Sequence, residues 1–437
     1  MFTQLTRAAF AGTVLLAAAC TALPGGARID PSVVPAGSVA FDGLLEADSG
    51  PRTEGSTRYI YMVHGMGNTS RDYSKHLFER MVDQGYNRTG GQDWVRAKLS
   101  TPLIVESEAT QCRGVTAPPC RYESFGEFRT DAFSKGRQRV VVYSYYWHAD
   151  LDLIQAPFMA ADIAEGQDRS LLIRGIKENT IVMGFSDAAA YLGPANRLVR
   201  EGLAVGLCAM LREAAGRPAR TQNGAVACDL TTLTTDDAQR FGQAEFGFVT
   251  MSLGSRMLFD TLADHAAASD PVLPALARRT RYFYMLANQL PLLGLGGVQV
   301  TEAPTTGPNA DGGAGLPSFG PPPRPRGFLA YMADVRGAAG VTSDASGPPP
   351  VTDSLDVVAF HDPEDLLGFR AGAGFADLRP SVRFIEVWNR NAPVYLGLVA
   401  DPRKAHATEL EHDTSARLIL CGARADANGR LTPLTCR

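Results

Sequence analysis

The sequence has little excess charge of either sign and lacks several common binding signatures. Its 42 Lys and Arg residues stand against 46 Asp and Glu, which gives a net charge of -4. Nucleic-acid binding usually requires a basic surface, so this balance argues against it. No Cys-x-x-Cys pair occurs, which leaves a zinc ribbon or a thioredoxin-type site without support. The stretch Gly294-Leu-Gly-Gly lacks the Gly-x-Gly-x-x-Gly pattern that follows a strand in dinucleotide-binding folds.

No long apolar run follows the first twenty residues, and no internal repeat is visible. We therefore expect the mature chain to be soluble apart from any N-terminal anchor. The 437 residues are 45% hydrophobic and 20% charged, which is a globular composition. This length allows one large α/β domain with insertions, or two domains.

The N-terminal residues predict a targeting segment. Arg7 supplies a weak positive charge, and the apolar run from Ala8 to Ala19 is too short to span a bilayer. The sequence Ala17-Ala-Ala-Cys20 resembles a bacterial lipobox, in which the cysteine is lipidated and becomes the mature N-terminus. We therefore predict a signal peptide at residues 1–19 and a lipid-anchored Cys20. The expected location is the bacterial cell envelope, in the outer membrane or facing the periplasm. Because leucine is usual at the position of Ala17, ordinary cleavage after Ala19 is the alternative.

Cysteine spacing is consistent with export. The six cysteines that remain after Cys20 fall into three local pairs, each enclosing a turn-rich segment. Six cysteines allow fifteen connectivities, so this pairing rests on proximity alone. Six reduced thiols are the alternative, which an oxidising compartment disfavours. The predicted pairs are Cys112–Cys120, Cys208–Cys228 and Cys421–Cys436.

Runs of β-branched and aromatic residues alternate with helical patterns along the chain. This alternation predicts an α/β fold in which helices cover both faces of a mostly parallel sheet. The predicted strands are 58–63, 139–147, 246–250, 279–286, 355–360 and 382–388, the last of these ending the sheet. Helices are expected at 72–84, 256–268, 328–336 and 363–369, whereas 87–135 has a mixed pattern.

The composition of the connecting segments suggests the domain organisation. Residues 20–55 are rich in Gly, Pro, Ala and Ser, which predicts a tether. Residues 56–437 then form one α/β domain, in which the Pro/Gly-rich stretch 301–327 is a loop. Three helical patterns precede the strand at 246–250, although one crossover helix would suffice. They lie at 151–164, 171–192 and 196–213, and we interpret 151–240 as a helical insertion or cap.

Two strand ends carry residues with catalytic potential. The strand at 246–250 leads into Ser252, and an amphipathic run from Arg256 to Ala268 follows. A strand, a sharp turn and a helix can hold a serine hydroxyl out over the sheet edge as a nucleophile. The strand at 58–63 ends in His64-Gly-Met-Gly67, the type of turn that supplies backbone N–H groups to an oxyanion.

A serine nucleophile needs an adjacent base, and that base needs an orienting acid. When the chain order is serine, acid and histidine, the last two lie on loops after the final strands. Asp362 and Asp365 follow the strand at 355–360 and are the candidate acids. Beyond the last predicted strand stand His406, in a loop-like stretch, and His412, where a final helix is expected to begin.

On these features the chain resembles the α/β-hydrolase superfamily, and more narrowly its bacterial lipoprotein and lipase-like members, over roughly residues 58–420. The resemblance rests on His64-Gly-Met-Gly67, on Thr250-Met-Ser252-Leu-Gly254, on the loop with Asp362 and Asp365, and on the late His406. It implies that Ser252 is the nucleophile, His406 the base and Asp365 the acid. It also implies an oxyanion hole made by the backbone N–H groups of Met66 and Leu253.

One position departs from this family pattern. Glycine usually stands two residues before the serine, because a Cβ there crowds the turn, and this chain has Thr250. Gly254 is retained on the other side.

Each candidate has an alternative interpretation. Ser252 is also a favoured helix N-cap residue. Asp362 is the alternative acid and His412 the alternative base, whereas His64 is expected to be structural. His361 with the two aspartates could be taken for a metal cluster, but no further ligand stands at a supporting spacing, so we expect no metal.

The sequence thus predicts an exported serine hydrolase that cleaves a carboxylic ester, in a small molecule or a lipid, through an acyl-enzyme and without a cofactor. A transacylase would use the same residues with an alcohol in place of water. A phospholipase or triglyceride lipase would need an apolar site beneath the predicted insertion. From a different class, the alternative is a non-catalytic envelope binding protein that has kept the fold, which Thr250 favours.

Overall fold

The computed structural model describes residues 26–29, 39–45, 56–67, 69–105, 120–155, 170, 185–242, 244–290, 325–339, 352, 354–370, 381–392, 394–395, 399–400, 402–407 and 410–436. The predicted signal peptide, the lipidation site Cys20 and most of the loop at 301–327 lie outside these residues. Within the described part of the chain, no helix is both long and apolar enough to cross a bilayer.

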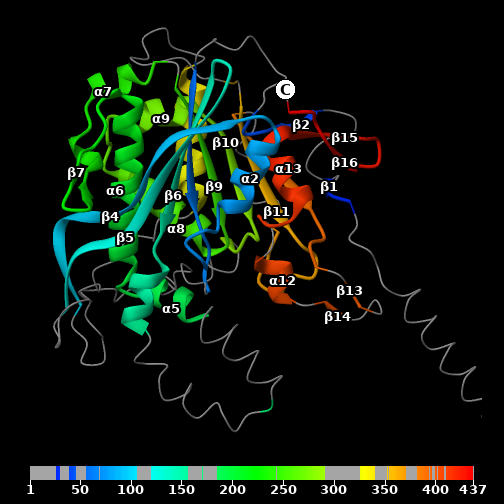
Figure 1. The fold of residues 1–437 in the computed structure, drawn as a ribbon, viewed down its shortest axis with the longest axis horizontal. Helices are drawn as coiled ribbons and strands as arrows, with labels where there is room; N and C mark the ends of the chain where they lie inside the picture. Colours follow the sequence, from blue (N-terminus) through cyan, green and yellow to red (C-terminus); the bar gives the residue numbers. More distant parts are fainter. Residues whose placement is uncertain are drawn as a thin grey trace, which may run out of the picture.

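An eleven-stranded sheet forms the centre of the molecule, in the order β1-β12-β11-β10-β9-β3-β6-β5-β4-β8-β7 (Figure 1). Six neighbouring strands run parallel to one another. They are β12 (Val382–Trp388), β11 (Leu355–His361), β10 (Thr280–Leu286), β9 (Glu245–Met251), β3 (Thr57–Val63) and β6 (Gln138–Tyr146). The six predicted strands are confirmed by these elements.

Burial explains why the central strands were visible in the sequence. Every residue of β9, β10 and β11 is buried, because helices cover both faces of the sheet. Successive side chains point to opposite faces, so Ile60 and Tyr61 of β3 enter two different apolar clusters.

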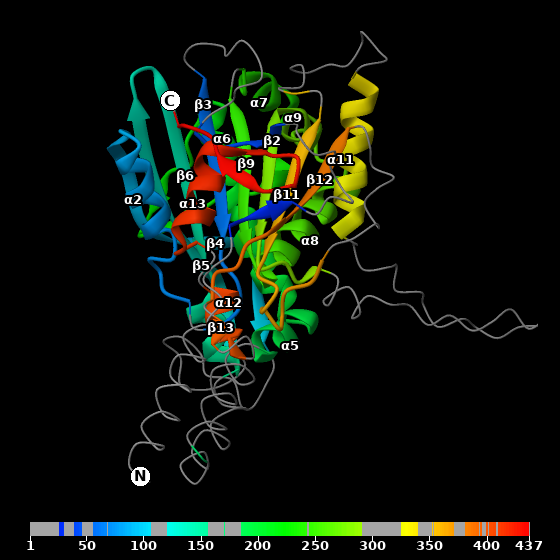
Figure 2. The same ribbon diagram turned by 90° about the vertical axis from the view of Figure 1, so that its right-hand side faces the viewer.

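Helices cover the two faces of the sheet, and Figure 2 shows α11 and α2 on opposite sides of it. The first face packs against α6 (Asn196–Ala214), α8 (Leu253–Ala267), α9 (Leu273–Arg279) and α11 (Pro325–Ala339). The second face packs against α2 (Lys75–Asp83), α13 (Asp413–Cys421) and a small sheet of β2 (Val39–Asp42), β15 (Gly422–Ala425) and β16 (Leu431–Pro433). The predicted α/β class, with a mostly parallel sheet between helices, is confirmed.

The predicted tether at 20–55 is wrong for the residues of it that the structure describes. β1 (Arg28–Ile29) pairs with β12, the last of the parallel strands, and β2 pairs with β15. Phe41 and Leu44 are fully buried in the second apolar cluster. The apolar pairs in this Gly- and Pro-rich segment are too short to show the two-residue alternation of a strand. They are nevertheless long enough to pair with the edge of a sheet.

The mixed pattern at 87–135 hides a long antiparallel hairpin. β4 (Asn87–Val105) pairs with β5 (Cys120–Lys135), and the pairing continues from β5 to β6. Only Val95, Ala97 and Leu99 of β4 are buried, at alternate positions, and residues 87–93 before them are polar or glycine, so the strand carries little hydrophobic signal. Beyond β4, β8 (Ala225–Ala227) and β7 (Thr221–Gln222) complete this edge.

The interpretation of 151–240 as an insertion or cap is wrong for its C-terminal half. α6 lies against the sheet, where Tyr61 donates a hydrogen bond to the carbonyl of Leu203. A Cβ at Gly202 would lie 2.3 Å from the Phe125 carbonyl oxygen, and a Cβ at Gly206 would lie 2.4 Å from the Tyr61 hydroxyl. These two glycines therefore let α6 approach the sheet as its crossover helix. Residues 156–169 and 171–184 lie outside the described part.

Two of the three predicted disulfides are present. They join Cys208 of α6 to Cys228, and Cys421 at the end of α13 to Cys436. Cys120 is also disulfide-bonded, and its predicted partner Cys112 lies outside the described residues.

The chain beyond β11 differs from the prediction at three points. The expected helix at 363–369 is absent, and turns stand in its place. β12 is not the last strand, because the short pair β13 (Val394–Tyr395) and β14 (Val399–Ala400) and then β15 and β16 follow it. His406 lies on a short helix, α12 (Pro402–Ala407), rather than in a loop.

Candidate functional site

The predicted site residues converge at one edge of the sheet. The six parallel strands end at the same edge, so the turns that follow them are neighbours. At this edge β3 lies between β9 on one side and β6 on the other. From β3 the chain goes on to β6 in one direction, whereas β9 to β12 follow one another in the opposite direction. The strand order therefore changes direction between β3 and β9, which is the usual location of a ligand crevice in open α/β sheets. Figures 1 and 2 show α12 and α5 (Ser186–Leu192) at this end of the molecule.

Ser252 occupies a strained turn between β9 and α8. Its φ of 52° and ψ of -126° lie in a backbone region that residues with a Cβ rarely adopt. Such a conformation costs about 1–3 kcal/mol. Its N–H donates to the carbonyl of Leu286 at 2.8 Å. The side chain makes no capping hydrogen bond to α8, so the N-cap interpretation of this serine is wrong.

Two glycines bring the turn after β3 into contact with the Ser252 turn. A Cβ at Gly65 would lie 2.6 Å from the Ser252 Cβ. A Cβ at Gly254 would lie 2.4 Å from the His64 carbonyl oxygen. Real Cβ atoms do not approach other atoms so closely, so only glycine fits at either position.

Thr250, the departure from the family pattern, is accommodated without crowding the turn. Its side chain is fully buried, and its hydroxyl lies 2.8 Å from the Ser255 hydroxyl. The same hydroxyl donates to the carbonyl of Tyr284 at 3.3 Å. The threonine thereby links β9 to α8 and to β10, and these links stabilise the turn that carries Ser252.

The Ser252 hydroxyl lies at one end of a continuous chain of hydrogen bonds. His406 Nε2 is 2.9 Å from Ser252 Oγ, and His406 Nδ1 is 2.8 Å and 2.9 Å from the two carboxylate oxygens of Asp365. The Asp365 side chain is completely buried, and 12% of the His406 side chain is exposed. A histidine held in this way can take a proton from the serine hydroxyl, while the carboxylate fixes its tautomer.

The turn after β11 presents Asp365 because its aspartates bind nearby backbone N–H groups. Asp362 Oδ1 accepts from the N–H of Glu364 at 2.8 Å, and Asp365 Oδ1 accepts from the N–H of Leu367 at 2.9 Å. Such local bonds compete with the helical hydrogen-bond pattern, which explains the missing helix at 363–369.

The alternative acid and base lie elsewhere. Asp362 Oδ2 accepts from the N–H groups of Asn391 and Ala392 at 2.5 Å and 3.0 Å, which ties the β11 turn to the segment after β12. His412 stands at the N-cap position of α13, as predicted, where burial lowers its pKa. In the described part of the chain, neither residue hydrogen bonds to Ser252 or His406.

His64 has a structural environment. It is fully buried, its ring stacks on Trp147 at a centroid distance of 4.8 Å, and burial lowers its pKa to about 3. Nδ1–H donates to the carbonyl of Gly65 at 2.7 Å, and Nε2 accepts from the N–H of Trp147 at 3.2 Å. The neutral ring therefore joins the ends of β3 and β6.

The turn that carries Met66 is held by a carboxylate that sequence reasoning missed. The N–H of Gly67, whose φ is +88°, donates to Asp187 Oδ2 at 2.7 Å. Asp187 lies on α5, is fully buried, and also accepts from Gln155. His148 Nδ1 lies 3.7 Å from Asp187 Oδ2. Burial by itself lowers the pKa of His148, but the Asp187 carboxylate outweighs burial and the pKa is raised. An isolated aspartate before three alanines gave no sequence signal for this contact.

The two predicted oxyanion donors belong to this arrangement. Met66 lies in the turn that packs against Ser252, and Leu253 is the first residue of α8. The first N–H groups of a helix have no acceptor within it, so the N–H of Leu253 has no partner inside α8. An anion at this position is also favoured by the helix dipole.

The described residues hold no group of three or more side chains that could bind a metal ion. The ring of His361, a residue of the apparent metal cluster in the sequence, packs against that of Trp388 at a centroid distance of 4.8 Å. Burial lowers the pKa of His361.

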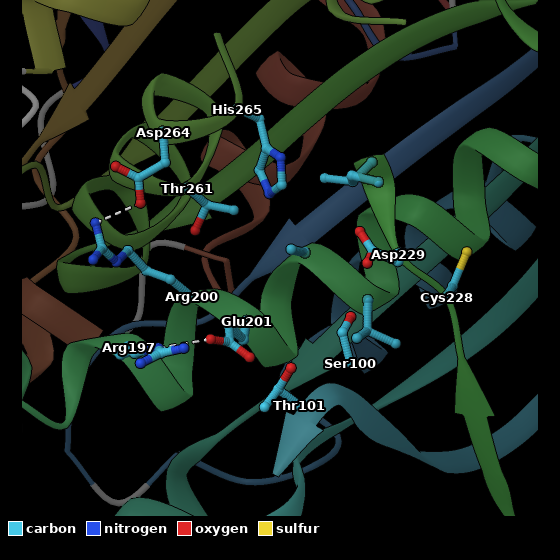
Figure 3. Close-up of a pocket in the computed structure, with 13 residues that line it drawn as sticks. Ser100, Thr101, Arg197, Arg200, Glu201, Cys228, Asp229, Thr261, Asp264 and His265 are labelled. Atoms are coloured by element: carbon cyan, nitrogen blue, oxygen red, sulfur yellow. Dashed lines mark hydrogen bonds and ion pairs between the residues drawn. The ribbon is translucent and has the colours of Figure 1, made fainter. Parts of the chain in front are cut away.

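A separate cavity of about 350 Å³ lies between β4, α6 and α8. Figure 3 shows the residues that line it. Its arginines are paired with carboxylates, Arg197 with Glu201 at 2.9 Å and Arg200 with Asp264 at 2.6 Å. None of the predicted catalytic or oxyanion-hole residues lines it, so its chemistry is distinct from that of Ser252.

Comparisons with known proteins give no relative: no family model, no curated protein and no solved structure matches this chain.

We predict that His64 makes the protein less stable in acid. Its pKa is 6.5 in an exposed position and about 3 in the fold, so below pH 6.5 the unfolded chain binds a proton that the folded chain does not. Stability should fall by about 1.4 kcal/mol per pH unit from this group alone between roughly pH 6 and pH 4. His64→Gln removes this contribution. Urea unfolding at a series of pH values should show the difference between wild type and variant shrinking as the pH falls, whereas parallel curves would contradict the buried neutral ring.

Proposed function

We propose that this protein is a serine hydrolase of the α/β-hydrolase superfamily that cleaves carboxylic esters through an acyl-enzyme. The observation that carries the proposal is the hydrogen-bonded series Ser252–His406–Asp365, with the serine in a strained turn at the carboxyl edge of a parallel sheet. A serine used only for packing needs neither the strain nor the histidine. This combination therefore favours an enzyme over a binding protein.

The first half of the reaction acylates Ser252. Its Oγ attacks the ester carbonyl while His406 Nε2 takes the hydroxyl proton. Asp365 accepts from Nδ1–H, which keeps Nε2 unprotonated in the resting state and stabilises the imidazolium that forms. The backbone N–H groups of Met66 and Leu253 receive the negative oxygen, a contribution of about 3–4 kcal/mol for each donor. His406 then gives its proton to the departing alkoxide, and the alcohol leaves.

The second half releases the acid. Water attacks the acyl carbon, His406 takes one of its protons, and the bond to Ser252 Oγ breaks as that proton is returned to the serine. Residues of the chain supply every proton acceptor and donor in this sequence. The proposal needs no cofactor.

The cellular location remains part of the proposal. The disulfides Cys208–Cys228 and Cys421–Cys436 are expected in an oxidising compartment, which supports export. A small-molecule or lipid ester at the cell envelope is the substrate that this location and the lipid anchor at Cys20 suggest.

We predict that Ser252→Ala abolishes both turnover of a short-chain nitrophenyl ester and labelling by a fluorophosphonate, because the attacking oxygen is lost. Ser100→Ala is the matched control, since it removes an exposed hydroxyl at the separate cavity of Figure 3. It should label and turn over like the wild type. Undiminished labelling of folded Ser252→Ala would assign the nucleophile to another residue.

We predict opposite effects for the two aspartates of the β11 turn. Asp365→Asn removes the charge that orients His406, so kcat should fall by about 10³- to 10⁴-fold with little change in unfolding. Asp362→Asn disturbs the bonds to Asn391 and Ala392, so it should cost about 1–3 kcal/mol of stability while the folded enzyme keeps most of its kcat. Steady-state kinetics and denaturant unfolding of both variants test this, and a reversed pattern would make Asp362 the acid.

A further inference from the structure

Gln289 is a buried residue in the site for which the proposed mechanism has no role so far. It follows β10, the strand next to β9, and 1% of it is exposed. The segment before it is rigid: Ala287 has a φ of +48°, and the Asn288 side chain accepts from the N–H of Leu290 at 3.0 Å. Asn288 also accepts, through its backbone carbonyl, from the N–H of Phe369 at 2.7 Å. The backbone that carries Gln289 is thereby fixed beside the Asp365 turn.

The side-chain amide of Gln289 lies at the reacting nitrogen of His406. Its Nε2 is 3.5 Å from His406 Nε2, the nitrogen that is 2.9 Å from Ser252 Oγ. Its Oε1 is buried, and among the described residues it has no hydrogen-bond partner. An unpaired buried acceptor costs about 1–3 kcal/mol, and native proteins keep few of them. A ligand that donates a hydrogen bond is the simplest explanation for one kept beside a candidate base.

The proposed reaction brings one such donor to this place. After the alcohol has left, the molecule that attacks the acyl-enzyme must lie against His406 Nε2, because it gives its proton to that nitrogen. A water molecule has a second O–H after donating to His406. An alcohol has only one O–H group, which His406 takes.

We propose that Gln289 Oε1 accepts the second hydrogen bond of the attacking water, and so makes the enzyme a hydrolase rather than a transacylase. This inference rests on the proposed acyl-enzyme. In the step, the water oxygen bonds to the acyl carbon, the bond from that carbon to Ser252 Oγ breaks, and one water proton passes through His406 Nε2 to Ser252 Oγ. The other proton stays on the carboxylic acid until it is released. An alcohol in the same position would leave Oε1 unpaired. Gln289 is thus a positioning residue for the second nucleophile.

The test is the partition of the acyl-enzyme between water and an added alcohol. The enzyme turns over a nitrophenyl ester in the presence of methanol, and the ratio of free acid to methyl ester is measured. This ratio does not depend on which step limits turnover. Gln289→Met keeps the size of the side chain and removes the acceptor, so the ratio should fall by about tenfold, the worth of one hydrogen bond. Gln289→Glu keeps an acceptor and should retain most of the ratio.

Two further variants complete the design. Gln289→Asn shortens the side chain by one methylene, which moves the amide away from His406 and keeps its polarity. This variant should lower the acid-to-ester ratio even if Gln289→Met does not fold. Gln239→Met makes the same chemical change at an exposed position on α7 (Thr235–Arg240) and should leave the ratio unchanged. Fluorophosphonate labelling of each variant reports whether Ser252 is still competent.

The outcomes separate this inference from the proposed function. An acid-to-ester ratio that is the same in wild type, Gln289→Met and Gln289→Asn, with normal labelling, would overturn the role of Gln289 and leave the acyl-enzyme standing. An equal fall for Gln239→Met would also overturn it. Absence of labelling and of ester turnover in the folded wild type would reject the proposed function, and the inference with it.

Discussion

Gly65 and Gly254 allow two backbone turns to meet with no side chain between them, and the geometry of the site depends on this contact. The turn after β3 can lie against Ser252 only because Gly65 has no Cβ, and the start of α8 can lie against His64 only because Gly254 has none. The serine is held at a φ of 52°, a conformation that persists only where the surrounding structure fixes it. Here the fixing comes from the parallel strands β3, β9 and β10, which are buried on both faces. The strain places the hydroxyl at the sheet edge, clear of the helix that follows.

Three buried carboxylates hold the turns around this contact, each through backbone N–H groups or a histidine. Asp187 binds the N–H of Gly67 and holds the turn of Met66. Asp362 binds the N–H groups that follow β12. Asp365 binds the N–H of Leu367 and the ring of His406. Of the three, only Asp365 contacts a side chain that reaches Ser252, so two aspartates three residues apart have different partners.

The parts of this arrangement that the sequence revealed are those with strong local patterns. Apolar and β-branched runs identify the buried parallel strands, because a strand covered on both faces has few polar positions. The order of Ser252, Asp365 and His406 narrowed the candidates, and the fold brings these three together. Thr250 gave a misleading signal of an impaired turn, because its hydroxyl finds partners in Ser255 and Tyr284 that no local pattern shows.

The parts that the sequence did not reveal depend on contacts between distant segments. β1 and β2 are too short to show a period, and they form because β12 and β15 present free edges. β4 is exposed or half-buried over most of its length, since it lies toward the edge of the sheet. Asp187 acts on Gly67 across 120 positions of sequence. The expected helix at 363–369 gave way to turns because Asp362 and Asp365 bind the backbone N–H groups two residues on.

We propose that the Ser252 hydroxyl, His406 and two backbone N–H groups surround one reacting carbon. A crystal structure of the protein after reaction with a small fluorophosphonate would reveal this arrangement. We predict a bond from phosphorus to Ser252 Oγ, with the phosphoryl oxygen about 3 Å from the nitrogens of Met66 and Leu253. An adduct on another residue, or a phosphoryl oxygen that faces away from both nitrogens, would contradict it.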